Sequence, residues 1–166
     1  MTDGDGWADA SPGAERHRIL RPLRQELARH PAVEAVRGLP DGGFAELEAR
    51  IDPAVFGRDA GSATLRVVWH PLPDGSDRPA GHQPEATDRS RTSFDAIFKL
   101  HYSEPGYDCG FHNEPNPHVE GWFHVQERFG PEEEYTYAEA RLEARTPTSA
   151  LWELLDLLQD RLDEGE

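Results

Sequence analysis

Apolar residues recur along the chain with two different periods, and the change of period separates the predicted elements. Near the N-terminus the apolar positions are three or four residues apart, with Arg and Glu between them, which predicts an amphipathic helix through Leu20, Leu23 and Leu27. Pro22 has no amide hydrogen to donate inside a helix, so we expect this helix either to start at Pro22 or to kink there. It ends at His30-Pro31, and residues 32–36 add a short turn.

The period changes to two in the middle of the chain, where apolar and polar residues alternate as they do in half-buried strands. The predicted strands cover residues 45–51, 63–70, 96–102, 107–112, 121–128 and 135–144. Pro105-Gly106 suits the centre of a type II turn and should join the third and fourth of these strands as a hairpin.

The end of the chain carries the clearest helical pattern. Thr146-Pro147 suits a helix cap and first turn, and a continuous apolar stripe follows at Leu151, Leu154, Leu155, Leu158 and Leu162. Together the elements predict an α+β fold, in which a single antiparallel meander sheet of about 5–6 strands is packed by an N-terminal and a C-terminal helix.

No repeat or second domain is visible in the pattern. Residues 1–13 are small, polar and rich in glycine, and we expect them to be disordered. Residues 14–166 then form one domain, a size that is large enough to bury a core. Residues 71–92 show no periodicity and are rich in Pro, Gly, Asp and Ser, so we expect a flexible loop there, either functional or disordered.

Charge is the strongest feature of the composition. The chain has 17 basic and 32 acidic residues, a net charge of −15, and Lys99 as its single lysine. Such a chain repels itself in dilute buffer, whereas molar salt shortens the Debye length to about 3 Å. We therefore expect the protein of a salt-accumulating, halophilic prokaryote. Because high salt weakens every phosphate contact, the acidity does not exclude RNA as a partner.

Cys109 is the only cysteine, so no internal disulfide can form. From its acidic, apolar-poor N-terminus we expect no secretory signal, and no stretch reaches the roughly 18 apolar residues of a membrane span. We expect a cytoplasmic protein that is not embedded in a membrane.

If the apolar strand faces pack beneath the helices, the opposite face of the sheet gathers polar residues. These are Arg50, Arg66, His70, Lys99, His101, His124, Gln126 and Arg128, with Trp122 beside them. Arg66, Lys99, Arg128 and Trp122 are the candidate binding residues, and Arg66 and Lys99 would receive an anion. The alternative is an ordinary solvated face, since residues that alternate with a core are polar in any half-exposed sheet.

Histidines supply the candidate chemistry. His101 and His124 are candidates for acid–base catalysis, because imidazole exchanges protons near neutral pH. His112, His118 and His124 recur every six residues and could supply imidazoles for metal binding or for proton transfer, although this is not a known metal-ligand spacing. The sequence therefore predicts neither a metal site nor a cofactor. His112 and His118, with Cys109, are the residues that would supply ligands if this loop held a metal.

The hairpin segment Cys109-Gly110-Phe111-His112-Asn113-Glu114-Pro115, followed by His118 and His124, resembles the TumE-like family, small proteins that form the toxin half of prokaryotic toxin–antitoxin pairs. In that family the equivalent segment reads Asp-Asn-Ala-Pro-His-His. Asn113, Pro115 and His124 match the pattern, whereas Asn116 and Pro117 stand where two histidines are expected. The resemblance spans roughly residues 20–160 as an order of elements. It implies Asn113 as a third site residue, RNA or the translation machinery as target, and an antitoxin protein as partner.

Three functions thus follow from the sequence. The first is a toxin-module protein acting on RNA or translation through His101 and His124, with Asn113 holding the turn. The second is a non-enzymatic interaction module that binds a partner through its sheet or its leucine-striped helix. The third is a small metal-binding regulator.

Overall fold

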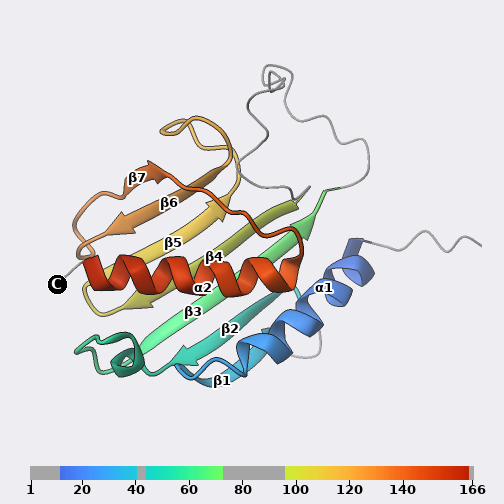
Figure 1. Ribbon diagram of the computed structural model, residues 1–166, viewed down its shortest axis with the longest axis horizontal. Helices are drawn as coiled ribbons and strands as arrows, with labels where there is room; N and C mark the ends of the chain where they lie inside the picture. Colours follow the sequence, from blue (N-terminus) through green and yellow to red (C-terminus); the bar gives the residue numbers. More distant parts are fainter. Residues whose placement is uncertain (1–11, 41–43, 73–95, 165–166) are drawn as a thin grey trace, which may run out of the picture.

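The computed structural model describes residues 12–40, 44–72 and 96–164. Its strands form one open antiparallel sheet in the order β1 to β7, so each strand pairs with the next in the chain. Both helices cover the same face of this sheet, α2 across its middle and α1 over β1, β2 and β3 (Figure 1). The elements are α1 Pro12–Leu27, β1 Val33–Leu39, β2 Glu46–Ile51, a 3-10 turn Pro53–Phe56, β3 Ala63–Pro71, β4 Ala96–Glu104, β5 Tyr107–Asn113, β6 Phe123–Arg128, β7 Thr136–Glu139 and α2 Pro147–Glu164.

The predicted α+β meander between two helices is confirmed, but the sheet has seven strands instead of five or six. The missed strand is β1, part of which we expected to be a turn. Its pairing with β2 shifts register between Val33 and Ala35, a bulge that breaks strict alternation. As a result Val33 and Val36 both pack against the core, although they are three residues apart.

Helix α1 begins earlier than the pattern suggested. It starts at Pro12, so of the two alternatives for Pro22 the helix start is wrong. Pro22 lies inside the helix and costs it one backbone hydrogen bond. Leu20, Leu23 and Leu27 are each at most 1% exposed, and this burial offsets the lost bond.

Helix α2 matches its predicted cap and stripe. The Thr146 hydroxyl accepts from the amide of Ser149 at 3.2 Å, which caps the first turn. The apolar stripe is entirely buried in the core at Leu151, Leu154, Leu155, Leu158 and Leu162. These leucines therefore pack in the protein's own core and do not form an exposed surface for a partner.

The β4–β5 hairpin turns at the predicted position. Gly106 has φ of +86°, the left-handed conformation that the third position of a type II turn requires. Glu104 pairs with Tyr107 across the turn, and this register extends to Phe98 opposite Asn113. At the far edge of the sheet, β7 is much shorter than the predicted strand 135–144.

Two further boundaries differ from expectation. The domain includes residues 12 and 13, which belong to α1, while the rest of the segment expected to be disordered, 1–11, lies outside the described residues. Pro71 belongs to β3, and residues 73–92 of the expected loop also lie outside the described part of the chain. Neither helix in the described ranges is long and apolar enough to cross a membrane.

Candidate functional site

Three histidines form a row on the face of the sheet that carries neither helix, which we call the open face. In β5, His112 stands opposite Lys99 of β4 and opposite His124 of β6. His101 stands opposite Gly110, two residues along, so its ring reaches His112 diagonally. The predicted shared face of His101 and His124 is therefore present, with His112 between them.

His101 and His112 contact each other through ring nitrogens. Nδ1 of His101 lies 3.3 Å from Nε2 of His112, so one ring donates a hydrogen bond to the other. Gly110 makes this approach possible, because a Cβ at that position would lie 2.3 Å from Nδ1 of His101 and 2.6 Å from Nε2 of His112. The ring of His112 also lies edge-on to that of His124, with centroids 5.6 Å apart.

A carboxylate lies at each end of the His101–His112 pair. Oδ1 of Asp108 is 3.8 Å from the outer nitrogen of His101, Nε2. Oε1 of Glu114 is 3.3 Å from the outer nitrogen of His112, Nδ1, although without hydrogen-bond geometry. We call the row Asp108, His101, His112 and Glu114 the relay. Its hydrogen bond joins the two imidazoles, and each imidazole can accept a proton at one nitrogen and release one from the other.

At neutral pH the environment favours uncharged imidazoles at His101 and His112 and an ionised carboxylate at Asp108. Burial lowers the pKa of His101, and it lowers the pKa of His112 further, helped by the neighbouring His101 and Lys99. Burial opposes ionisation of Asp108, but hydrogen bonds from Ser103 and Arg128 hold its pKa below the usual value. At neutral pH one ring nitrogen of the pair is therefore a free base, and Asp108 can stabilise the imidazolium that forms when it accepts a proton.

His124 is fixed in one tautomer by its neighbours. Oδ1 of Asn116 accepts from the amide of His118 at 2.9 Å, so its NH₂ group must face Nε2 of His124, 3.2 Å away. Nε2 of His124 is then an acceptor, and Nδ1 carries the proton that it donates to the carbonyl of Trp122 at 2.9 Å. Burial lowers the pKa of His124 as well, and its side chain is completely buried. His124 thus packs against His112 and has no contact with solvent.

The three cations among the sequence-predicted binding residues are all ion-paired. Lys99 lies 2.9 Å from Glu114, Arg128 lies 2.5 Å from Asp108, and Arg66 pairs with Glu46. Lys99 and Arg128 thus hold the two carboxylates of the relay. An anion that binds at any of these cations must first displace a carboxylate.

The other sequence-predicted residues lie near the row or behind it. Trp122 is half-buried in the loop before β6, where its carbonyl accepts from His124 and from the amide of Glu114. Asn113 projects into the core, and its amide donates to the carbonyl of Ala96 at 2.7 Å. Cys109 is also on the core face, where burial raises the pKa of its thiol to about 12. Neither side chain joins the histidines.

No group of three or more potential ligands in the described ranges is arranged to hold a metal ion. His118 instead stacks on Tyr137, with ring centroids 4.7 Å apart. Tyr135 lies beneath the guanidinium of Arg128, 4.7 Å from the ring centre, and edge-on to His101. These two tyrosines close one side of the row.

Sequence reasoning missed Asp108 as a site residue, and it named His112 for metal binding or proton transfer without placing it beside His101. The signal for both was present in the predicted hairpin. A two-residue turn at Pro105-Gly106 pairs residues whose numbers are equally far from it, which sets Ser103 opposite Asp108 and Lys99 opposite His112.

Comparison of the chain with protein-family models, with curated proteins and with solved structures finds no match. The resemblance to the TumE-like family therefore stays a prediction.

Proposed function

We propose that the open face carries a general acid–base centre, and that the protein is a toxin-module enzyme that cleaves RNA at this centre. The observation that supports it best is the 3.3 Å contact between Nδ1 of His101 and Nε2 of His112, with Asp108 beside the outer nitrogen of His101. Nucleophile-activating bases in enzymes are commonly imidazoles oriented by a second group on the other ring nitrogen.

His101 is the residue that exchanges a proton with the substrate. Its side chain is 21% exposed, against 7% for His112, so Nε2 of His101 is the more accessible end of the pair. When Nδ1 of His101 donates to His112, Nε2 holds a lone pair and accepts a proton from a hydroxyl group. Asp108 then faces the new positive charge, and His112 holds the ring in place.

RNA is a substrate that a general base of this kind can cleave. His101 removes the proton of the 2′-hydroxyl, that oxygen forms a bond to the adjacent phosphorus, and the bond from phosphorus to the 5′-oxygen breaks as this oxygen takes a proton from water. Lys99 and Arg128 are the nearest cations for the phosphate. Their ion pairs are partly exposed and therefore weak, so a phosphate can compete with the carboxylate for either cation.

The test is cleavage of a labelled single-stranded RNA by purified wild-type protein, with DNA of the same sequence as a substrate that lacks the 2′-hydroxyl. We expect RNA fragments ending in a 2′,3′-cyclic phosphate, no cleavage of DNA, and at least a hundredfold slower cleavage by His101→Ala. The matched control is His118→Ala, which removes an exposed histidine outside the pair and should leave the rate unchanged. Equal rates for wild type and His101→Ala, or intact RNA with folded wild type, would reject the proposal.

A growth assay connects this chemistry to the toxin hypothesis. Induced wild-type protein should arrest a prokaryotic host, and His101→Ala at the same protein level should not. Co-expression of an antitoxin partner should relieve the arrest. Arrest by both proteins would separate toxicity from the histidine pair and reject the toxin assignment of this site.

A second candidate is a non-enzymatic interaction module, favoured by the pairing of Arg66, Lys99 and Arg128 with carboxylates. A face of mutually neutralised charges suits a polar protein partner. Its interface would be the open face, because the leucine stripe of α2 is buried. Folded protein that neither cleaves RNA nor arrests growth would favour this candidate.

A further inference from the structure

A cavity of about 490 Å³ lies between α1 and the start of the sheet, away from the histidine row. It is lined by His17, Arg21, Arg24, Gln25, Ala28, Val36 and Phe44. Four of these positions, 17, 21, 24 and 28, are spaced by four, three and four residues, so they follow one stripe of the helix. The volume is in the range of small-molecule sites and exceeds what a bare inorganic anion fills.

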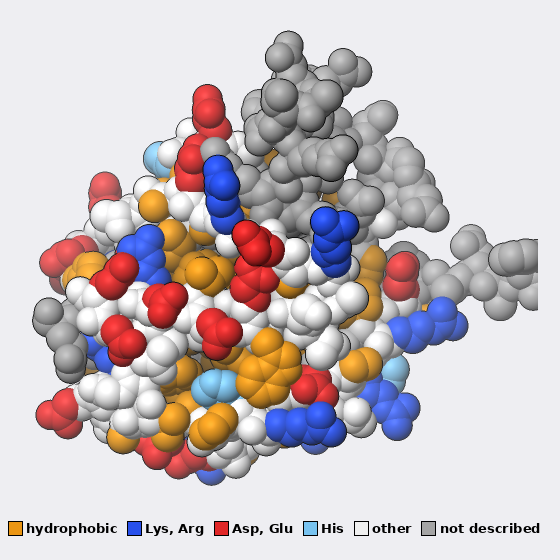
Figure 2. Space-filling view, in the orientation of Figure 1, with side chains coloured by type: hydrophobic (Ala, Val, Ile, Leu, Met, Phe, Trp, Pro, Cys, Tyr) orange, Lys and Arg blue, Asp and Glu red, His pale blue; other side chains and the backbone are white. Residues whose placement is uncertain are grey.

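The cations of this cavity differ from those of the open face. No ion pair among the described residues involves Arg21 or Arg24, although the chain has nearly two acidic residues for each basic one. Helix α1 carries four arginines, at 16, 18, 21 and 24, against the two glutamates Glu15 and Glu26. On the helix-covered face in Figure 2, basic side chains gather along α1, whereas acidic ones are scattered over α2. The cavity is thus a local positive site on an acidic protein.

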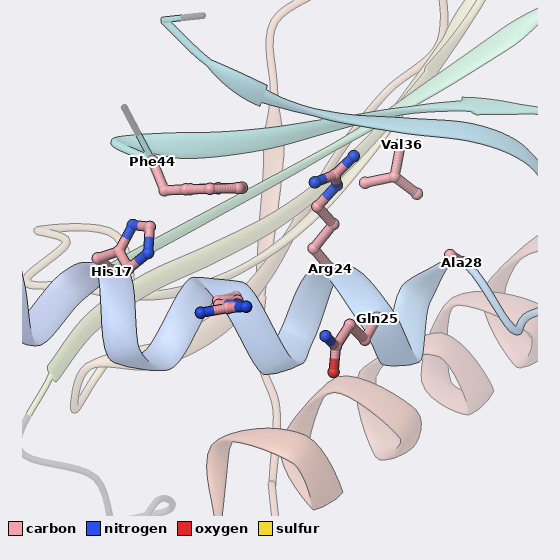
Figure 3. Close-up of a pocket in the computed structure, with 7 residues that line it drawn as sticks. His17, Arg24, Gln25, Ala28, Val36 and Phe44 are labelled. Atoms are coloured by element: carbon pink, nitrogen blue, oxygen red, sulfur yellow. The ribbon is translucent and has the colours of Figure 1, made fainter. Parts of the chain in front are cut away.

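The lining also has an apolar side. Figure 3 shows His17 and Arg24 rising from α1 toward Phe44, with Val36 beside the guanidinium. The guanidinium of Arg24 lies 5.8 Å from the centre of the Phe44 ring, and His17 meets that ring edge-on at 4.9 Å. Cation–π contacts of exposed arginines are weak, so Arg24 can turn to a ligand at little cost.

We propose that this cavity binds a small organic phosphate monoester, with the phosphate between Arg21 and Arg24 and the apolar part against Val36 and Phe44. Two guanidinium groups balance the double charge of a phosphate monoester, and their planar forks match its oxygens. A singly charged carboxylate leaves one guanidinium uncompensated. The cavity adjoins α1 on the helix-covered side of the sheet, so this site is independent of the acid–base centre.

The probe for this site is phenyl phosphate, titrated into isotope-labelled protein and followed by NMR at the lowest KCl concentration that keeps the protein folded. We expect saturable shifts of the His17, Val36 and Phe44 signals, and no such shifts with phenol. Benzoate should bind several-fold more weakly. Each lost charge-assisted contact should weaken binding, so Arg21→Ala/Arg24→Ala should raise the Kd roughly tenfold or more.

Arg18→Ala is the matched control, because Arg18 is an exposed arginine of the same helix that does not line the cavity. It should change the Kd less than twofold. Arg21→Lys/Arg24→Lys keeps the charge but loses the planar forks, and should give an intermediate Kd. Three results would overturn the proposal: equal weakening by Arg18→Ala and the double alanine variant, no shifts at the cavity residues, or benzoate binding as tightly as phenyl phosphate.

Discussion

His101 and His112 stand on neighbouring antiparallel strands, two residues out of direct register, with Nδ1 of one ring 3.3 Å from Nε2 of the other. The contact requires the residue opposite His101 to have no side chain, and that residue is Gly110. The pair is therefore a property of three positions on two strands, and each can be tested by substitution.

Gly110→Ala should separate the two rings. The new Cβ would lie within 2.6 Å of a nitrogen of each histidine, so both side chains must move. We expect loss of the hydrogen bond and about 1–3 kcal/mol less free energy of unfolding, the usual cost of overpacking. Urea denaturation measures the stability, and ¹⁵N shifts of the imidazoles report the hydrogen bond.

The control for that substitution is Gly61→Ala, because a Cβ at Gly61 meets nothing within 4 Å. It should change stability by less than about 0.5 kcal/mol. Imidazole shifts that stay at their wild-type values in Gly110→Ala would show that the two rings do not contact each other.

Stability should fall as the pH is lowered below neutral. Burial lowers the pKa values of His101, His112 and His124, so the unfolded chain, with histidine near 6.5, binds protons that the folded chain does not. The contribution of each neutral histidine to the free energy of unfolding is fully present above about pH 6.5, the pKa in the unfolded chain. It is lost as the pH falls toward the lower pKa of that histidine in the folded protein. Each such imidazole contributes a slope of up to about 1.4 kcal/mol per pH unit.

Denaturant unfolding at pH values from 7.5 to 5 tests this slope. His112→Gln should flatten it, because His112 is the most strongly perturbed of the three. A pH-independent wild type would contradict the prediction. Asp108 adds no pH dependence to the stability in this pH range, because its pKa in the folded protein lies below the usual carboxyl value.

Asn113→Ala should destabilise the protein through the core. The substitution removes the donor to the carbonyl of Ala96, which leaves that group unsatisfied at a cost of about 1–3 kcal/mol. Thr136→Ala removes a hydrogen bond from an exposed hydroxyl to a backbone carbonyl and should cost less. RNA cleavage by folded Asn113→Ala should equal that of the wild type. A slower reaction at full stability would instead place Asn113 in the site.

Arg58→Ala should be more harmful than removal of an exposed arginine. Arg58 pairs with Glu104 at 2.5 Å, and the Glu104 side chain is only 4% exposed. Loss of the guanidinium leaves a buried carboxylate with the hydroxyl of Tyr102 as its remaining donor among the described contacts, so we expect a loss of about 3 kcal/mol. Arg50→Ala breaks an exposed pair with Glu34 and should cost below about 1 kcal/mol. Equal losses in thermal or urea unfolding would contradict this difference.

Local pattern was enough to predict most of the fold. Alternation along β3 and β4 predicted which of their residues face the core. The leucine stripe of α2 predicted the side of this helix that packs on the sheet. Strand β1 was missed because its bulge places Val33 and Val36 on one face at a spacing that strict alternation does not allow. Local pattern left open whether α1 starts at Pro22 or continues through it, because burial of neighbouring leucines outweighs the lost hydrogen bond only once the sheet is present.

The sequence by itself determined the elements, the polar character of the open face, and the presence of His101 and His124 on it, because these depend on the period of neighbouring residues. Tertiary structure decided which polar groups meet. The pairing of β5 with β6 across a long loop brings His112 opposite His124, and no local signal sets that register. Tertiary structure also pairs Lys99 and Arg128 with carboxylates while leaving Arg21 and Arg24 at a cavity, because charge pairing depends on distance in space and not on position in the chain.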